Sequence, residues 1–90
     1  MKSLDGRYDL LHTFAKCLGL KFNVGKTPDN WNYEAVLYRV ESDGIKAPMY
    51  TGYGLTKDEA CNDLLDFIMM CNDFKSEDEM RVWIDLNDLS

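Results

Sequence analysis

The fold is decided by residues 52–60, which have the sequence Gly-Tyr-Gly-Leu-Thr-Lys-Asp-Glu-Ala. Thr56 and Glu59 have the spacing of a capping box, in which each side chain accepts a hydrogen bond from a backbone N–H at the other's position, so a helix is expected to begin here. Glycines near a lysine are also typical of phosphate loops, but the Lys-Ser/Thr order of a nucleotide P-loop is missing. We therefore predict a strand end followed by a helix cap, with acidic residues where a phosphate site would need basic ones.

The chain before this junction predicts one helix and three strands. A helix is expected over residues 7–18, ended by Gly19 in the left-handed conformation. Strands are expected over residues 20–24, 31–40 and 47–53, with a hairpin turn at 42–44 and with Pro48 confined to the start of a strand or to an edge. In the second strand, the odd-numbered residues from 31 to 39 lie on one face and the even-numbered residues from 34 to 40 on the other. This mixed pattern predicts a central strand with a helix on one side and partly exposed aromatic residues on the other.

After the junction, a second helix is predicted over residues 57–72. The helical period places these residues on its core side: Ala60, Leu64, Phe67, Ile68 and Cys71. Leu65 and Met69 fall outside this face and need a second cover, which the apolar tail at residues 80–86 can supply as a short strand or helix. The fold class is therefore α+β, in the order α-β-β-β-α, with a three-stranded antiparallel sheet packed on two helices and a short C-terminal extension.

The length of 90 residues allows one hydrophobic core. We expect an α+β domain over residues 1–74 and an acidic extension over residues 75–90 that docks on or near the second helix. The net charge of −6 is unevenly distributed, because residues 1–54 carry a net +1 and residues 55–90 a net −7. The three cysteines form no close pair and no apolar run reaches the length of a membrane span, which favours a reduced, cytoplasmic protein.

Catalytic chemistry finds little support in the sequence. His12 is the only histidine, and Cys17 lies five positions away on a different helix face, so the two do not form a nucleophile and base pair. The carboxylates form an exposed stripe and not a cleft, and the spacing of a calcium loop is absent. We expect no enzyme activity, no metal and no cofactor.

Two segments resemble the double-stranded-RNA-binding domain. Residues 10–20 resemble the first helix of that family, L-L-x-E-Y/F-A-x-x-x-G-L, and residues 52–60 are similar to its signature G-x-G-x-S/T-K-K-x-A-K. Together the two matches span residues 8–72. A second resemblance, to HicB-like antitoxins and small phage domains, covers residues 33–68 and leaves the first helix unexplained.

The chain departs from the RNA-binding family at the positions that the family uses for its function. Asp58 and Cys61 stand where the family has its second and third lysines, and Thr13 stands where it has a groove-contacting Glu. The loop at residues 26–30 has no G-P-x-H sequence. Because an acidic face repels phosphates, these changes weaken the case for duplex RNA. The alternative nucleic-acid-binding residues are Lys16, Lys21, Lys26 and Lys57.

The second helix and the extension carry an acidic stripe, which is either an ordinary solvated face or a binding surface. Its members are Glu59, Asp63, Asp66, Asp73, Glu77, Asp78 and Glu79. Met70 lies within the stripe and offers flexible apolar contact. We expect a non-catalytic protein-binding module that acts as an inhibitor or adaptor of a nucleic-acid-handling protein. In this hypothesis the acidic stripe imitates nucleic acid and binds a basic surface of the partner.

The size and charge are similar to those of phage-encoded inhibitors of host enzymes, of the anti-CRISPR or anti-defence type. Two alternatives remain open. One is a nucleic-acid-binding domain with weakened phosphate contacts. The other is a homodimerisation module that uses a sheet face or edge near Trp31, Tyr33 and Tyr50.

Overall fold

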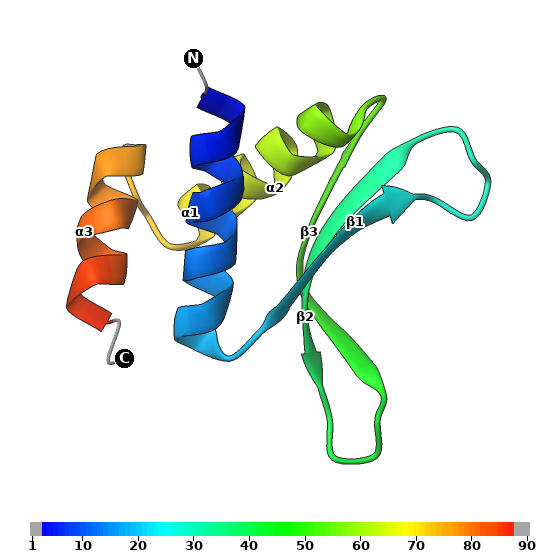
Figure 1. Cartoon of the computed structure of the whole chain (residues 1–90), viewed down its shortest axis with the longest axis horizontal. Helices are drawn as coiled ribbons and strands as arrows, with labels where there is room; N and C mark the ends of the chain where they lie inside the picture. Colours follow the sequence, from blue (N-terminus) through cyan, green and yellow to red (C-terminus); the bar gives the residue numbers. More distant parts are fainter. Residues whose placement is uncertain (1–2, 88–90) are drawn as a thin grey trace.

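The computed structural model of this chain describes residues 3–87 and confirms the predicted α+β fold. Its elements are α1 (Ser3–Leu18), β1 (Lys21–Lys26), β2 (Tyr33–Val40), β3 (Lys46–Gly54), α2 (Lys57–Cys71) and α3 (Glu77–Asn87). The strands form one antiparallel sheet in the order β1-β2-β3. All three helices lie on the same side of this sheet, and no helix or strand of residues 3–87 covers the other side (Figure 1). This arrangement is compatible with the duplex-RNA-binding-like fold that the sequence resemblance implies.

The helix α1 begins earlier than predicted, at Ser3, and ends as predicted at Leu18, directly before Gly19. Gly19 has a φ of 70°, its N–H donates to the Lys16 carbonyl, and the N–H of Leu20 donates to the Ala15 carbonyl. This is the Schellman pattern, which ends a helix with a left-handed residue. The chain then turns directly into β1.

The hairpin between β2 and β3 forms at the predicted turn, where Gly44 has a φ of 87° and donates its N–H to the Glu41 carbonyl. Pro48 lies in β3, which is an edge strand, as the sequence predicts. The pairing skips Met49, because Leu37 pairs with Tyr50 and Tyr38 pairs with Pro48. The resulting bulge at Met49 lies next to Pro48, which has no N–H to donate to the neighbouring strand.

The buried face of α2 is rotated relative to the prediction. Ala60, Leu64 and Ile68 are buried as expected, but Phe67 and Cys71 are exposed. The buried positions that replace them are Cys61 and Leu65. The reason is that α2 packs against the sheet on one side and against α1 on another, so two adjacent faces of the helix are covered.

The C-terminal segment forms α3, which lies beside α1 and runs in the same direction (Figure 1). Met80 and Ile84 are buried in the same cluster as Phe14 of α1 and Leu64 of α2. The ring of Trp83 packs against that of Phe14, with 5.4 Å between centroids. The helix α3 therefore contributes to the one core that the described residues share.

Candidate partner-binding face

The two glycines of the junction lie directly beneath α2. A Cβ built on Gly52 would lie 2.2 Å from the backbone N of Leu64, and one built on Gly54 would lie 2.6 Å from the backbone N of Ala60. Real Cβ atoms do not approach other atoms this closely, so only glycine allows the helix to rest on β3. The backbone of α2 fills the space that a phosphate would need at these glycines.

The predicted cap of α2 is confirmed, with one difference. The N–H of Glu59 donates to Thr56 Oγ1 at 3.1 Å, as in a capping box. The carboxylate of Glu59 accepts from the N–H of Leu55 at 2.9 Å, one residue before the expected donor. The helix α3 repeats this arrangement, because Glu79 bonds to Ser76 Oγ through its N–H and to the N–H of Lys75 through its carboxylate. Two members of the acidic stripe therefore also cap helices.

Other members of the acidic stripe also have structural contacts. Asp63 Oδ2 accepts a hydrogen bond from the N–H of Tyr53 at 2.9 Å, which ties α2 to the edge strand β3. Asp73 follows α2 with a φ of 58° and donates its N–H to the Met70 carbonyl, so it occupies the left-handed position that glycine occupies after α1. Its carboxylate lies 3.6 Å from Lys75 Nζ, and both side chains are exposed.

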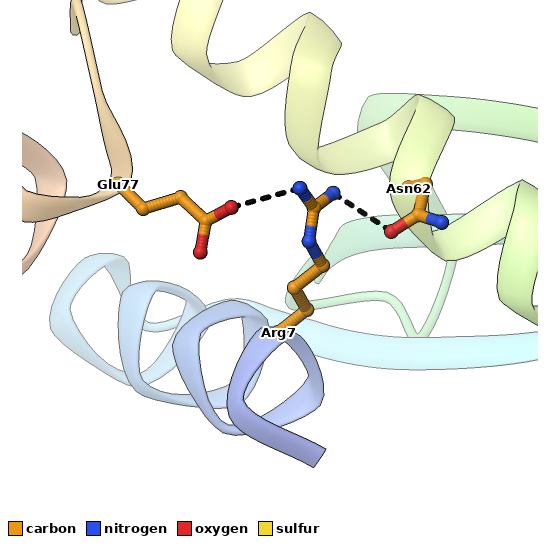
Figure 2. Close-up of polar contacts among 3 residues, drawn as sticks. All are labelled: Arg7, Asn62 and Glu77. Carbon is orange, nitrogen blue, oxygen red and sulfur yellow. Dashed lines mark hydrogen bonds and ion pairs between the residues drawn. The ribbon is translucent and has the colours of Figure 1, made fainter. Parts of the chain in front are cut away.

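Glu77 belongs to a contact among all three helices, shown in Figure 2. Arg7 of α1 donates through Nη1 to Asn62 Oδ1 of α2 at 2.8 Å, and its Nη2 lies 2.8 Å from Glu77 Oε2 of α3. About a third of each of the two charged side chains is exposed. This ion pair connects the first turn of α3 to α1, and it already engages one of the two oxygens of the Glu77 carboxylate.

One part of the stripe combines charge with apolar surface. Asp63, Asp66, Phe67 and Met70 line a hollow beside Thr51 of β3. Phe67 is 37% exposed and Met70 is 71% exposed. These four positions follow the spacing of one helix face, and Phe67 is the member that the sequence analysis placed in the core. We call Glu59, Asp63, Asp66, Phe67 and Met70 the α2 acidic face.

The four lysines proposed for nucleic acid separate into two pairs, although all four are exposed. Lys26 and Gly54 both pair with Tyr33, and Lys57 begins α2 three residues after Gly54, so Lys26 and Lys57 lie at one end of the sheet. Lys16 and Lys21 lie at the other end of β1, roughly 17 Å away for a strand of this length. The lysines do not form one continuous basic patch.

The residues proposed for self-association are not together on an exposed surface. Tyr33 and Tyr50 pack against the core on the helix side of the sheet, where the Tyr50 ring contacts those of Phe14 and Phe67. Only Trp31, in the loop between β1 and β2, is highly exposed, at 80%. Tyr33 and Tyr50 therefore do not lie on the uncovered face of the sheet, although Tyr50 belongs to the edge strand β3. Self-association near these residues stays a prediction.

Tyr8 of α1 and Cys61 of α2 form a small ionisable pair at the edge of the core, where Cys61 is buried and Tyr8 is partly buried. A hydrogen bond with Cys61, together with burial, raises the pKa of Tyr8 to about 12. Burial raises the pKa of the Cys61 thiol, although its hydrogen bond with Tyr8 acts in the opposite direction. Both groups stay protonated at neutral pH, so neither a thiolate nor a phenolate nucleophile forms there.

Among the side chains that the structure describes, residues 7–87, no three of His, Cys, Asp or Glu are grouped so that they could hold a metal ion. No helix in this range has the length and apolar character needed to cross a membrane. Comparison of the chain with protein-family models, with curated proteins and with solved structures yields no match. The candidate site therefore depends on the geometry of the α2 acidic face.

Proposed function

We propose that this chain is a small non-catalytic protein-binding module that presents the α2 acidic face to a basic protein surface. The observation that supports this proposal is the hollow in which Asp63 and Asp66 lie beside Phe67 and Met70, with no lysine or arginine among its lining residues. Exposed apolar side chains within a charged rim are typical of protein-binding surfaces. Flexible Met70 adds a contact that can adapt to the partner.

The partner class follows from the charge. Residues 55–90 carry a net −7, and nucleic-acid-handling proteins carry the basic grooves that such a surface fits. Carboxylates on one helix can occupy a groove that otherwise binds phosphates, which makes the chain an inhibitor or adaptor of such a protein. Its size and charge resemble those of phage-encoded anti-defence inhibitors. Electrostatic steering would speed this association at low salt.

Duplex RNA is the second candidate ligand, since Lys26 and Lys57 are exposed at the same end of the sheet. Asp58 and Glu59 directly follow Lys57 and oppose phosphate binding at this end. We therefore rank RNA below a basic protein.

The test removes the charge and keeps the fold. In the triple variant Glu59→Gln/Asp63→Asn/Asp66→Asn, the amide oxygens can still accept the hydrogen bonds from the Leu55 and Tyr53 N–H groups, whereas lysine substitutions would break them. The matched control neutralises three exposed carboxylates outside this face, in the variant Glu41→Gln/Asp43→Asn/Asp85→Asn. Both variants change the net charge equally.

The partner is captured on immobilised wild-type chain, identified, purified and then titrated against all three proteins. We expect the triple variant to bind at least about tenfold more weakly, a loss of about 1.4 kcal/mol, and the control to bind almost as well as wild type. Equal binding by the two variants would remove the α2 acidic face from the mechanism. Sub-micromolar binding of duplex RNA at low salt that weakens on Lys57→Glu would favour the second candidate instead.

A further inference from the structure

The uncovered face of the sheet carries more apolar surface than is usual for a sheet face in contact with water. The residues that line a hollow on this outer sheet face are Asn23, Glu34, Val36, Tyr38, Lys46, Pro48 and Thr51. Antiparallel sheets with one face in water usually carry polar residues on that face. Here Val36 and Tyr38 lie on the central strand β2, Pro48 lies beside Tyr38 on β3, and Tyr53, which pairs with Glu34, is 54% exposed. Such a surface indicates a contact with another molecule.

Charges of opposite sign lie at the two ends of this face. Glu34 lies at one end, next to Tyr53, whose pKa its charge raises. At the other end, Lys21 pairs in register with Tyr38, and Lys46 Nζ lies 5.2 Å from the centroid of the Tyr38 ring. The apolar residues lie between these ends. Unlike the α2 acidic face, the outer sheet face therefore carries negative charge at one end and positive charge at the other.

A second copy of the chain fits this pattern. Two identical faces associate stably only when the surface is complementary to itself. If the two-fold axis lies between the sheets and perpendicular to the strands, the Glu34 end of one copy faces the Lys46 end of the other. An axis parallel to the strands would instead place Glu34 against Glu34. Charge therefore selects the first arrangement.

We propose that the outer sheet face is the contact surface of a homodimer, in which the Glu34 end of each copy packs against the Lys46 end of its partner. The helices lie on the opposite side of each sheet from this face (Figure 1). The α2 acidic face begins at the β3 edge of the contact, because Thr51 lines both the hollow of that face and the hollow of the outer sheet face. Each copy carries a net charge of −6, which opposes association and is offset by the local charge pairs.

The outer sheet face is small for a dimer interface. Three strands of about eight residues cover roughly 14 Å by 26 Å, so the dimer buries on the order of 700 Å² in total. This area lies below that of standard stable interfaces, so we expect a weak association that forms only at high protein concentration.

Sedimentation velocity of the full chain over about 10–500 µM tests the proposal, with circular dichroism as the check on folding. We expect a concentration-dependent dimer. Glu34→Lys and Lys46→Glu should each weaken it at least tenfold, and the double variant should restore it to within about threefold of wild type. Glu34→Lys changes the net charge from −6 to −4, which by itself favours association, so a weaker dimer identifies the local charge pair.

A further pair of variants separates this face from the helical side. Val36→Lys places a charge at the centre of the contact and should abolish the dimer. Val82→Lys, at an exposed position on α3, should leave it unchanged. A wild-type chain that stays monomeric at every concentration overturns the proposal. So does a dimer that Val36→Lys does not affect, and a double charge variant that fails to recover overturns the two-fold arrangement.

Discussion

Replacement of Gly52 by alanine tests the central structural argument, that β3 and α2 touch backbone to backbone. The added Cβ would lie 2.2 Å from the Leu64 N and 2.6 Å from the Leu64 Cα, whereas ordinary contacts begin at 3.4 Å. The helix and the strand would have to separate by about 1.2 Å, because backbone atoms cannot move aside by changing rotamer.

That separation loosens the buried residues that α2 contributes to the core, which are Ala60, Cys61, Leu64, Leu65 and Ile68. Overpacking of a core costs about 1–3 kcal/mol, and a gap of 0.5–1 Å forfeits about a quarter to a half of each van der Waals contact. We therefore expect Gly52→Ala to lower the free energy of unfolding by about 3 kcal/mol, near the top of that range. For a chain of this size, the melting temperature would fall by roughly 12–24 °C.

The matched control is Gly25→Ala in β1, where an added Cβ would meet no atom within 4 Å. This control should be neutral or stabilising by up to about 1 kcal/mol, because alanine lowers the entropy of the unfolded chain. Urea unfolding followed by circular dichroism measures both variants. A Gly52→Ala protein within about 0.5 kcal/mol of wild type would refute the close-contact argument.

Three further outcomes are expected. Asp73→Gly should raise the free energy of unfolding by about 1 kcal/mol, because glycine adopts the left-handed conformation without strain; a lower urea midpoint would contradict this. Arg7→Met should lower the free energy of unfolding by about 1–2 kcal/mol, because the mutation removes both polar contacts of the guanidinium. A double-mutant cycle with Glu77→Gln should give a coupling of roughly 0.5 kcal/mol that shrinks at high salt. Folding raises the pKa values of Tyr8 and Cys61, so the native state holds these protons more tightly, and stability that is complete below about pH 8.5 should fall as the pH rises toward 12. Tyr8→Phe should flatten this alkaline loss in urea titrations, and an unchanged slope would exclude Tyr8 as its source.

The candidate site could be predicted only in part. Helical spacing places the carboxylates of the α2 acidic face on one side of α2, and Met70 among them. The pattern predicts that Glu59 caps α2, but it does not reveal that Asp63 bonds to the backbone N–H of Tyr53, because that contact depends on how α2 lies on β3. Phe67 was missed because the helical period alone places it on the core side, whereas in the structure its ring lies against Tyr50 of the edge strand β3 and stays 37% exposed.

Local chemistry in the sequence determined where the elements begin and end. A glycine after α1, a hairpin turn before β3 and the Thr56 cap of α2 each act through hydrogen bonds between residues a few positions apart. Such contacts form whatever the rest of the chain does, so the order of strands and helices can be predicted from short segments.

Packing between distant segments decided the remaining features. It set which faces of α2 are buried, placed α3 beside α1, and divided the lysines between the two ends of the sheet. Gly52 and Gly54 show the difference most clearly. The sequence marks them as the end of a strand, but only the tertiary structure shows that the backbone of α2 lies against them, because that contact joins residues whose separation depends on the whole fold.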